Sequence, residues 1–399
     1  MRRFSDAEEP ALVGVEGSWP VLFRASGVLG FVLLRRRPSG HYEPSWPRLL
    51  PMAAIVSAMG WHLFTFPFSF TDVAYDAFAD ITSYSLNVVY ITHAFGVAVY
   101  RRRETRQLLR GLEGTQEPAK AWVSVAGSLV FILHTALYFA INYLIVSWDS
   151  LYTFHWVCMT LIFPVLPLLF ALYLASLIHA LTQVYRRTAK ELGRGCSEGR
   201  PWASVSLRLD KVLPGLQELE DNVPSQSIYH LRRSVRDFNG VASIVTHCKK
   251  LSHLVSLYNQ IFSGAIALTL LTFLVNLLNS TYYTAISFGD WFMFYGGGLS
   301  YTVTVICYFY LLCGRADALR AAHDMVEEAL LDLQQHPDTS SDDRNRLLSL
   351  SLHLRNRPAH ISVGSMGGLS SSTFVVMVNA ALTYTAILFQ YRPTSSKDQ

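Results

Sequence analysis

The last apolar stretch of the chain, residues 367–391, carries polar side chains at helical spacing. Near its end, in TYTAILFQY, Thr383, Ile387 and Gln390 fall on one face of a helix. Polar groups within a membrane cost free energy unless they face water or protein. Such a face suits ion conduction, with Ile387 as a hydrophobic constriction and Gln390 as a polar ring near the outer mouth. Hydrogen bonding between neighbouring membrane helices would also explain these residues.

Composition places this helix in a membrane protein. Of the 399 residues, 51% are hydrophobic and only 16% are charged, whereas soluble domains carry about a quarter charged residues. The five cysteines include no CxxC pair, so no disulfide framework is predicted. The sequence has no HExxH, phosphate-loop or nucleophile-elbow motif. We therefore expect no enzyme, no metal site, no cofactor and no nucleic-acid partner.

Seven apolar stretches are long enough to cross a bilayer, which predicts an all-α, seven-transmembrane fold. They cover residues 49–70, 77–100, 121–146, 151–180, 258–283, 291–313 and 367–391. An earlier apolar stretch, 20–34, contains Arg24, and the apolar run that follows Arg24 is too short to cross a bilayer. We expect an interfacial helix there.

Basic residues mark alternate loops between these spans. All but two of the 33 lysines and arginines lie before the first span or in the loops after the second, fourth and sixth. The other loops contain none, and only Arg392 and Lys397 follow the last span. Because basic loops stay in the cytoplasm, the N-terminus is predicted to be cytoplasmic and the C-terminus extracellular. This orientation is the reverse of a G-protein-coupled receptor.

Aspartates gather on the side that lacks basic residues. Either carboxylates simply flank helices there, or they form a negative outer vestibule that concentrates cations. The residues of this possible vestibule are Asp72, Asp76, Asp80, Asp149 and Asp290.

Two spans are predicted to continue into the cytoplasm as helices. Apolar residues recur every three or four positions in 225–258, which leads into the fifth span, and in 315–333, which extends the sixth. A further short helix, 344–356, ends before Pro358. Apolar stripes need partners, so we expect a packed cytoplasmic bundle, either within one subunit or between subunits.

The end of the chain resembles a family signature. Thr383-Tyr384, five mostly apolar residues and Gln390-Tyr391 are similar to the TYhhhhhQF motif of the insect (arthropod) gustatory receptor family, with Tyr391 in place of Phe. The stretch 247–266, with Asn259 and Phe262, resembles that family's approach to its fifth span. Where the family has Leu-Asp before its last helix, this chain has Leu369-Ser370.

The resemblance implies a ligand-gated, non-selective cation channel in the plasma membrane, in contact with membrane lipid. It implies a homotetramer, or a heterotetramer with related subunits, anchored by the cytoplasmic bundle. The seventh helix would line the pore, with Thr383, Ile387, Gln390 and Tyr391 at the gate. The ligand would be a small tastant, with polar candidates favouring a sugar-like molecule. A bitter-compound receptor of the same family and a multi-pass secondary transporter are the alternatives.

A ligand pocket is implied among the outer halves of the first six spans. Amide, imidazole and aromatic groups there could hold a small polar molecule, or could equally be satisfied by neighbouring helices. The candidates are Trp61, His62, Tyr84, Asn87, His134, Tyr138, Asn142, His155, Trp156, Asn276 and Tyr282.

These expectations divide the chain into alternating cytoplasmic and membrane segments. The segments are a cytoplasmic N-terminal stretch (1–48), spans one to four (49–185), a cytoplasmic helical region (186–257), spans five and six (258–313), a second cytoplasmic helical region (314–366), the pore helix (367–391) and an extracellular tail (392–399).

Overall fold

Helices make up most of the described part of the chain. The computed structural model describes residues 20–36, 42–65, 74–112, 151–197, 205, 209, 240–286, 299–337 and 339–390. The helices are α2 (Pro20–Val28), α3 (Leu49–Thr65), α4 (Ala74–Tyr100), α5 (Arg102–Gly111), α7 (Leu151–Ser197), α10 (Gly240–Ile286), α12 (Ser300–Gln335), α13 (Ser341–Asn356) and α14 (Ser371–Gln390).

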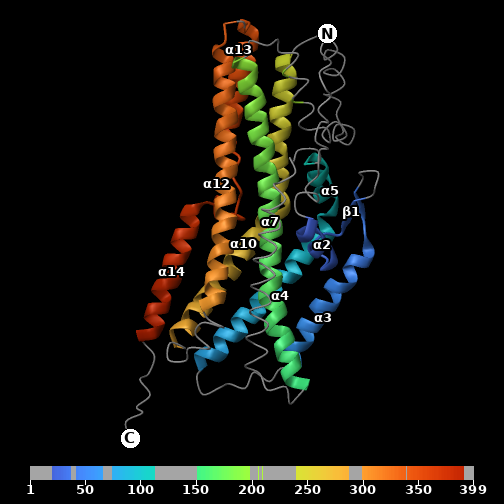
Figure 1. Ribbon diagram of the computed structural model, residues 1–399, viewed down its shortest axis with the longest axis vertical. Coiled ribbons are helices and arrows are strands. Elements are labelled where there is room, and N and C mark those ends of the chain that lie inside the picture. Colours follow the sequence, from blue (N-terminus) through green and yellow to red (C-terminus); the bar gives the residue numbers. More distant parts are fainter. Residues whose placement is uncertain are drawn as a thin grey trace, which may run out of the picture.

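Three helices are much longer than a membrane is thick. α7 and α10 each have 47 residues and α12 has 36, which corresponds to roughly 70 and 54 Å against a hydrocarbon core of about 30 Å. In Figure 1 their upper halves form a column with α13, and α3, α4 and α14 surround their lower halves. The expected continuation of the sixth span through 315–333 is confirmed. Of the expected helix 225–258, α10 covers the part from Gly240, and residues 225–239 lie outside the described residues.

Apolar windows long enough to cross a membrane occur in all three long helices. They fall within Leu166–Gly195, Gly240–Tyr282 and Thr302–Gln335, and α14 is a shorter apolar helix over Ser371–Ile387. The six helices α3, α4, α7, α10, α12 and α14 overlap six of the expected spans. The expected span 121–146 lies outside the described residues.

The N-terminal segment differs from the expected helix over 20–34. Helix α2 ends at Val28, and the chain turns at Gly30, whose φ is +85°. A side chain at Gly30 would lie 2.7 Å from the carbonyl oxygen of Arg48, so only glycine fits. The chain then forms β1 (Leu34–Arg36), paired antiparallel with β2 (Tyr42–Pro44). Arg48 Nη1 donates to the carbonyls of Val32 and Leu34 at 3.1 and 2.6 Å, which fixes this hairpin.

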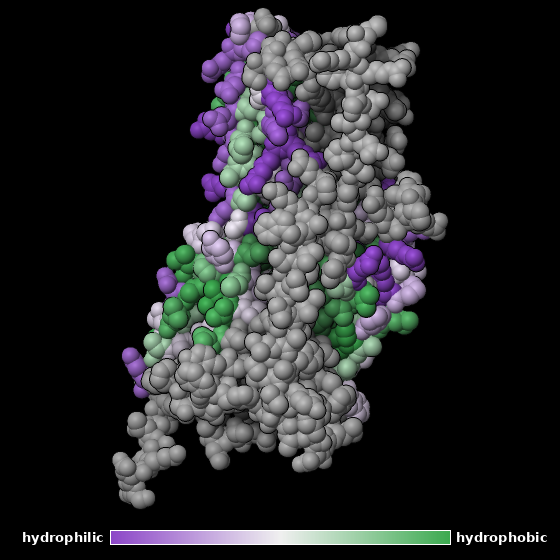
Figure 2. All heavy atoms as spheres, in the orientation of Figure 1, coloured by the Kyte–Doolittle hydropathy of each residue, from purple (hydrophilic) through white to green (hydrophobic). Residues whose placement is uncertain are grey.

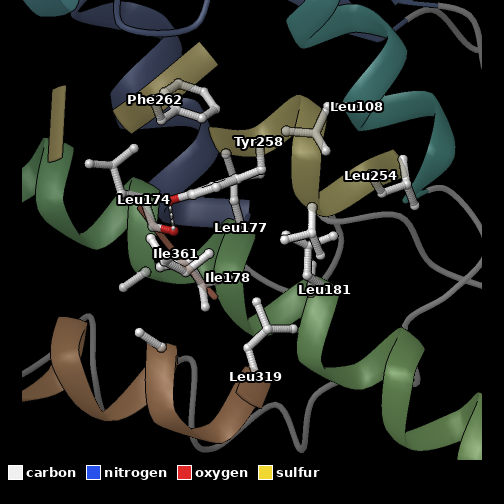
Figure 3. Packing of buried hydrophobic residues seen from close by; sticks show 14 of the residues in the cluster. Leu108, Leu174, Leu177, Ile178, Leu181, Leu254, Tyr258, Phe262, Leu319 and Ile361 are labelled. Atoms are coloured by element: carbon white, nitrogen blue, oxygen red, sulfur yellow. Dashed lines mark hydrogen bonds between the residues drawn. The ribbon is translucent and has the colours of Figure 1, made fainter. Parts of the chain in front are cut away.

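The core lies where α7 meets α12 and α10. Leu177, Ile178 and Leu181 of α7 are fully buried, as is Leu319 of α12, and Figure 3 shows Leu319 pointing toward Ile178 and Leu181. Tyr258 of α10 packs on the same cluster. The apolar stripes of the extended helices therefore pack against one another within a single subunit.

One histidine of the column is buried in its neutral form. His247 of α10 is 4% exposed, and its Nε2 lies 3.2 Å from the hydroxyl of Thr188 on α7. Burial, with a smaller contribution from the charge of Lys250, lowers its pKa from 6.5 to about 4. The unfolded chain therefore binds an extra proton between these two pH values. The free energy of unfolding therefore has its full value, as far as His247 is concerned, above pH 6.5. It decreases as the pH falls toward 4.

We expect the purified protein to lose stability on acidification because of this residue. Lowering the pH to 5 should reduce the free energy of unfolding by roughly 2 kcal/mol through His247 alone. Thermal unfolding in detergent between pH 7 and pH 5 measures the effect. His247→Gln should flatten the pH dependence, whereas His253→Gln, at an exposed position of the same helix, should leave it unchanged. The same pH dependence in both variants would contradict the assignment.

Candidate functional site

Helix α14 is attached to the rest of the subunit by one face. Near its start, the ring of Phe374 packs edge-on against Phe309 and Tyr310 of α12, with centroids 5.3 and 5.4 Å apart. Near its end, the hydroxyls of Thr385 and Thr281 lie 2.6 Å apart, which joins α14 to α10. Thr385 is therefore the polar residue of TYTAILFQY that serves helix packing.

The opposite face of α14 is open. Asn379, Thr383, Ile387 and Gln390 are all exposed and recur every three or four residues, and Ile387 retains 41% of its surface. The hydroxyl of Thr383 donates to the carbonyl of Asn379 at 2.8 Å, so it needs no partner on another helix. This polar stripe, here called the open face, therefore has no packing role within the described subunit.

Exposed apolar residues border the open face. Leu382 and Tyr384, beside this face, are 55% and 60% exposed, and Val376, on the same face as Thr383, is 67% exposed. On the side shown in Figure 2, the surface over α14 is mainly hydrophobic, whereas the surface over α12 and α13 above it is mainly hydrophilic. A helix with 20 residues is roughly 30 Å long, the thickness of the hydrocarbon core. α14 thus has the length and surface of a single membrane crossing.

The segment that leads into α14 is held by one side chain of α10. Asn259 Nδ2 donates to the carbonyl of His360 at 2.8 Å, and its Oδ1 accepts from the backbone N–H of Ser362 at 3.0 Å. The segment folds back on itself, with Leu369 N–H donating to the Ile361 carbonyl at 2.8 Å. Gly367, at φ +114°, makes the reversal possible. Asn259 therefore fixes the backbone through which α14 enters.

Polar groups also line the contact between α4 and α10. The Ser83 hydroxyl donates to Asn276 Oδ1 at 2.9 Å, and Thr269 donates to the Tyr90 hydroxyl at 3.0 Å. Between these pairs lies Asn87, which is 5% exposed and whose Oδ1 has no hydrogen-bond partner within the described residues. A buried, unpaired amide oxygen is costly, so this position suits a donor from a water or a ligand.

A family model described as 7tm chemosensory receptor matches residues 21–395, nearly the whole chain. The chain belongs to the 7tm chemosensory receptor family. A comparison with curated protein sequences gives no match.

Solved structures of insect receptors share the receptor's fold. The olfactory receptor OR5 from Machilis hrabei, in complex with eugenol, aligns with a TM-score of 0.60 over 93% of this chain and 96% of that one, at 12% identity. The same receptor in a second structure aligns with a TM-score of 0.54 at the same coverage and identity. The expected helical, seven-transmembrane fold class is thereby confirmed, and the match at this identity concerns the fold alone.

The structure places the expected ligand-binding residues in different environments. Asn87 and Asn276 lie on the polar α4–α10 contact, and Tyr84 donates its hydroxyl to the Met59 carbonyl of α3 at 2.8 Å. Tyr282 is buried, whereas Trp61 is 68% exposed.

The other site residues named from the sequence fall where side chains are not described. His62 lies on α3, Asp76 and Asp80 on α4, and His155 and Trp156 on α7, by backbone alone. Outside the described residues lie Asp72, His134, Tyr138, Asn142, Asp149, Asp290 and Tyr391.

A groove of about 450 Å³ occurs elsewhere in the receptor, between the column halves of α7 and α12. Arg186 and Lys190 line one side, and Glu328 and Asp332 line the other. It lies far along these helices from the residues expected to bind a ligand, and the opposite charges of its two sides favour contact between α7 and α12.

The polar contacts of α4 with α10, of α10 with α14 and of α12 with α14 were not predicted from the sequence. The α4 spacing of Ser83, Asn87 and Tyr90 could have indicated one polar face. The link between Thr281 and Thr385 joins two separate spans, so no local pattern reveals it. The same holds for Asp317, whose carboxylate contacts Ser371.

Proposed function

We propose that the receptor is a subunit of a tastant-gated, non-selective cation channel of the gustatory type. Four subunits, identical or related, would place their α14 helices around a central pore in the plasma membrane. The observation that carries the proposal is the open face of α14. Asn379, Thr383, Ile387 and Gln390 are exposed on a membrane-length helix whose other face is already packed. Such a stripe is costly in lipid and favourable beside water and symmetry-related copies of itself.

The gate would lie at Ile387, with Gln390 forming a polar ring beyond it. A ring of apolar side chains can block ions by excluding water. Aspartates near the outer ends of the spans would attract cations to the mouth. This arrangement favours a channel over a secondary transporter, because a transporter would need no exposed polar stripe on a single helix.

The expected orientation supplies the first experiment. A C-terminal epitope tag should be stained on intact cells, since the N-terminus is proposed to be cytoplasmic and the C-terminus extracellular. Staining only after permeabilisation, while an N-terminal tag is reached on intact cells, would overturn both the orientation and the pore.

Widening the proposed gate should produce a leak. Ile387→Ala is expected to raise the basal sodium current roughly tenfold at equal surface density, because a smaller apolar ring no longer excludes water. Whole-cell recording in the absence of any tastant measures this current. Leu382→Ala, at an exposed apolar position of α14 that lies off the open face, is the matched control and should show no leak. No increase in the Ile387→Ala current would contradict the gate, and flux limited to transporter turnover would favour the rival class.

The proposed ligand is a small hydroxylated molecule, held in the outer part of the helical domain. Its support is the buried polar contact between α4 and α10, where the Asn87 amide oxygen lacks a partner in the described part of the chain. Because a receptor of similar fold is solved with eugenol, a screen should combine sucrose and fructose with caffeine and eugenol. A current evoked only by eugenol would move the proposal from taste toward olfaction.

A further inference from the structure

A carboxylate from another helix caps the proposed pore helix. Asp317 of α12 accepts a hydrogen bond from the backbone N–H of Ser371, the first residue of α14, at 2.8 Å. The hydroxyl of Ser371 donates to the same oxygen of Asp317. The two residues are 54 positions apart, so this contact exists only when α12 and α14 are packed together.

A carboxylate is a favourable partner for the N-terminus of a helix. The first N–H groups of a helix lack partners, and the helix dipole places partial positive charge there. In the described part of the chain no lysine or arginine forms an ion pair with half-buried Asp317. Ser370, the local capping residue, accepts from Thr373 N–H only at 3.4 Å. The α14 N-terminus is thus capped chiefly from α12.

This contact and the Thr385–Thr281 contact are polar ties at opposite ends of α14. Asp317 ties the inner end to α12, and Thr385 ties the outer end to Thr281 of α10. The tied residues, Ser371 and Thr385, are roughly 21 Å apart along the helix. A displacement of α12 relative to α10 would therefore pull on the two ends of α14 in different directions and favour a tilt. Ile387 lies just beyond the outer tie, so such a tilt would move the proposed gate.

We propose that Asp317 is the positioning residue that couples movement of α12 to the pore helix α14, so that opening by a tastant depends on its carboxylate. This inference rests on the channel function proposed above. It assigns Asp317 a role in transmission, beyond the stability that any helix cap provides.

Three variants separate transmission from capping. Asp317→Ala removes both the cap and the tie. Asp317→Asn keeps an oxygen that can accept both hydrogen bonds. Asp317→Ala combined with Ser370→Asp restores a carboxylate cap from α14's own N-terminus and leaves α12 untied. Asp324→Ala, at an exposed position two turns further along α12, is the matched control.

The measurement is sodium current evoked by sucrose, fructose, caffeine or eugenol, whichever gives the largest wild-type response, at equal surface density. We expect Asp317→Ala to lower sensitivity to that compound about tenfold, within the usual range of coupling between sites. Asp317→Asn should stay within about threefold of wild type, since the amide oxygen preserves the tie. The combined variant should recover surface density and thermal stability while its current remains impaired.

Two results would overturn the inference. One is an unchanged concentration response in Asp317→Ala, and the other is full recovery of current in the combined variant, which would reduce Asp317 to a cap. If Asp317→Ala fails to reach the surface, the combined variant decides alone, because its cap is repaired. Absence of wild-type current with every compound is a separate outcome, which removes the channel function itself and the inference with it.

Discussion

Replacing Asn259 by alanine is expected to lower the function of the receptor at least tenfold. The substitution removes both hydrogen bonds that hold the backbone at His360 and Ser362. Each net hydrogen bond contributes roughly 1 kcal/mol, so the two together hold the segment by about 2 kcal/mol. The segment that carries α14 would then lose its fixed position. We expect at least a tenfold loss of surface receptor or of current, measured by surface staining and whole-cell recording.

Neighbouring substitutions make this prediction specific. Gln260→Ala, at the exposed adjacent position, should behave as wild type. Asn259→Asp keeps an acceptor for Ser362 N–H but cannot donate to the His360 carbonyl, so it should retain only part of the function. A wild-type phenotype for Asn259→Ala would show that the remaining contacts of the segment suffice without it.

Truncating Leu319 should have the largest effect on stability. Its side chain is fully buried between α12 and the α7 residues Ile178 and Leu181 (Figure 3). Leu319→Ala removes buried apolar volume and leaves a cavity, which costs about 2–5 kcal/mol in closely packed cores. The thermal midpoint of the detergent-solubilised protein should fall clearly, and the amount of monodisperse protein on size-exclusion chromatography should fall with it.

An adjacent residue provides the comparison. Arg320→Ala changes an exposed position one residue further along α12 and should alter the midpoint little. If the two variants are equally stable, the α7–α12 contact is not the main source of stability in the column.

The fold was largely predictable because hydrophobicity and charge act locally along the chain. The lengths of the apolar stretches predicted the spanning helices that the structure describes. The recurrence of apolar residues every three or four positions in 315–333 predicted that α12 continues beyond the sixth span. The turn at Gly30 and the β1–β2 hairpin were not predicted. They depend on contacts with Arg48, which lies 14 residues after Leu34, and short strands give a weak pattern.

The site was predictable in part. The spacing of Thr383, Ile387 and Gln390 predicted that they share one face of a helix. In the structure all three residues are exposed on α14. The spacing could not show that Thr385 packs on Thr281, or that Asp317 reaches Ser371 from 54 positions away. Such pairings depend on how helices are assembled, which a single sequence does not display.

The open face of α14 has a consequence for inherited variation in this protein. In the proposed homotetramer, every subunit carries the same substitution, and the four copies face a shared axis. A substitution at Thr383 that shifts the closed–open balance by about 0.5 kcal/mol per subunit would change it by about 2 kcal/mol per channel, or roughly thirtyfold. If half the subunits came from a different gene, the shift would be halved. Small polymorphisms on this stripe should therefore have large effects in cells that express the receptor alone, and muted effects where it is mixed.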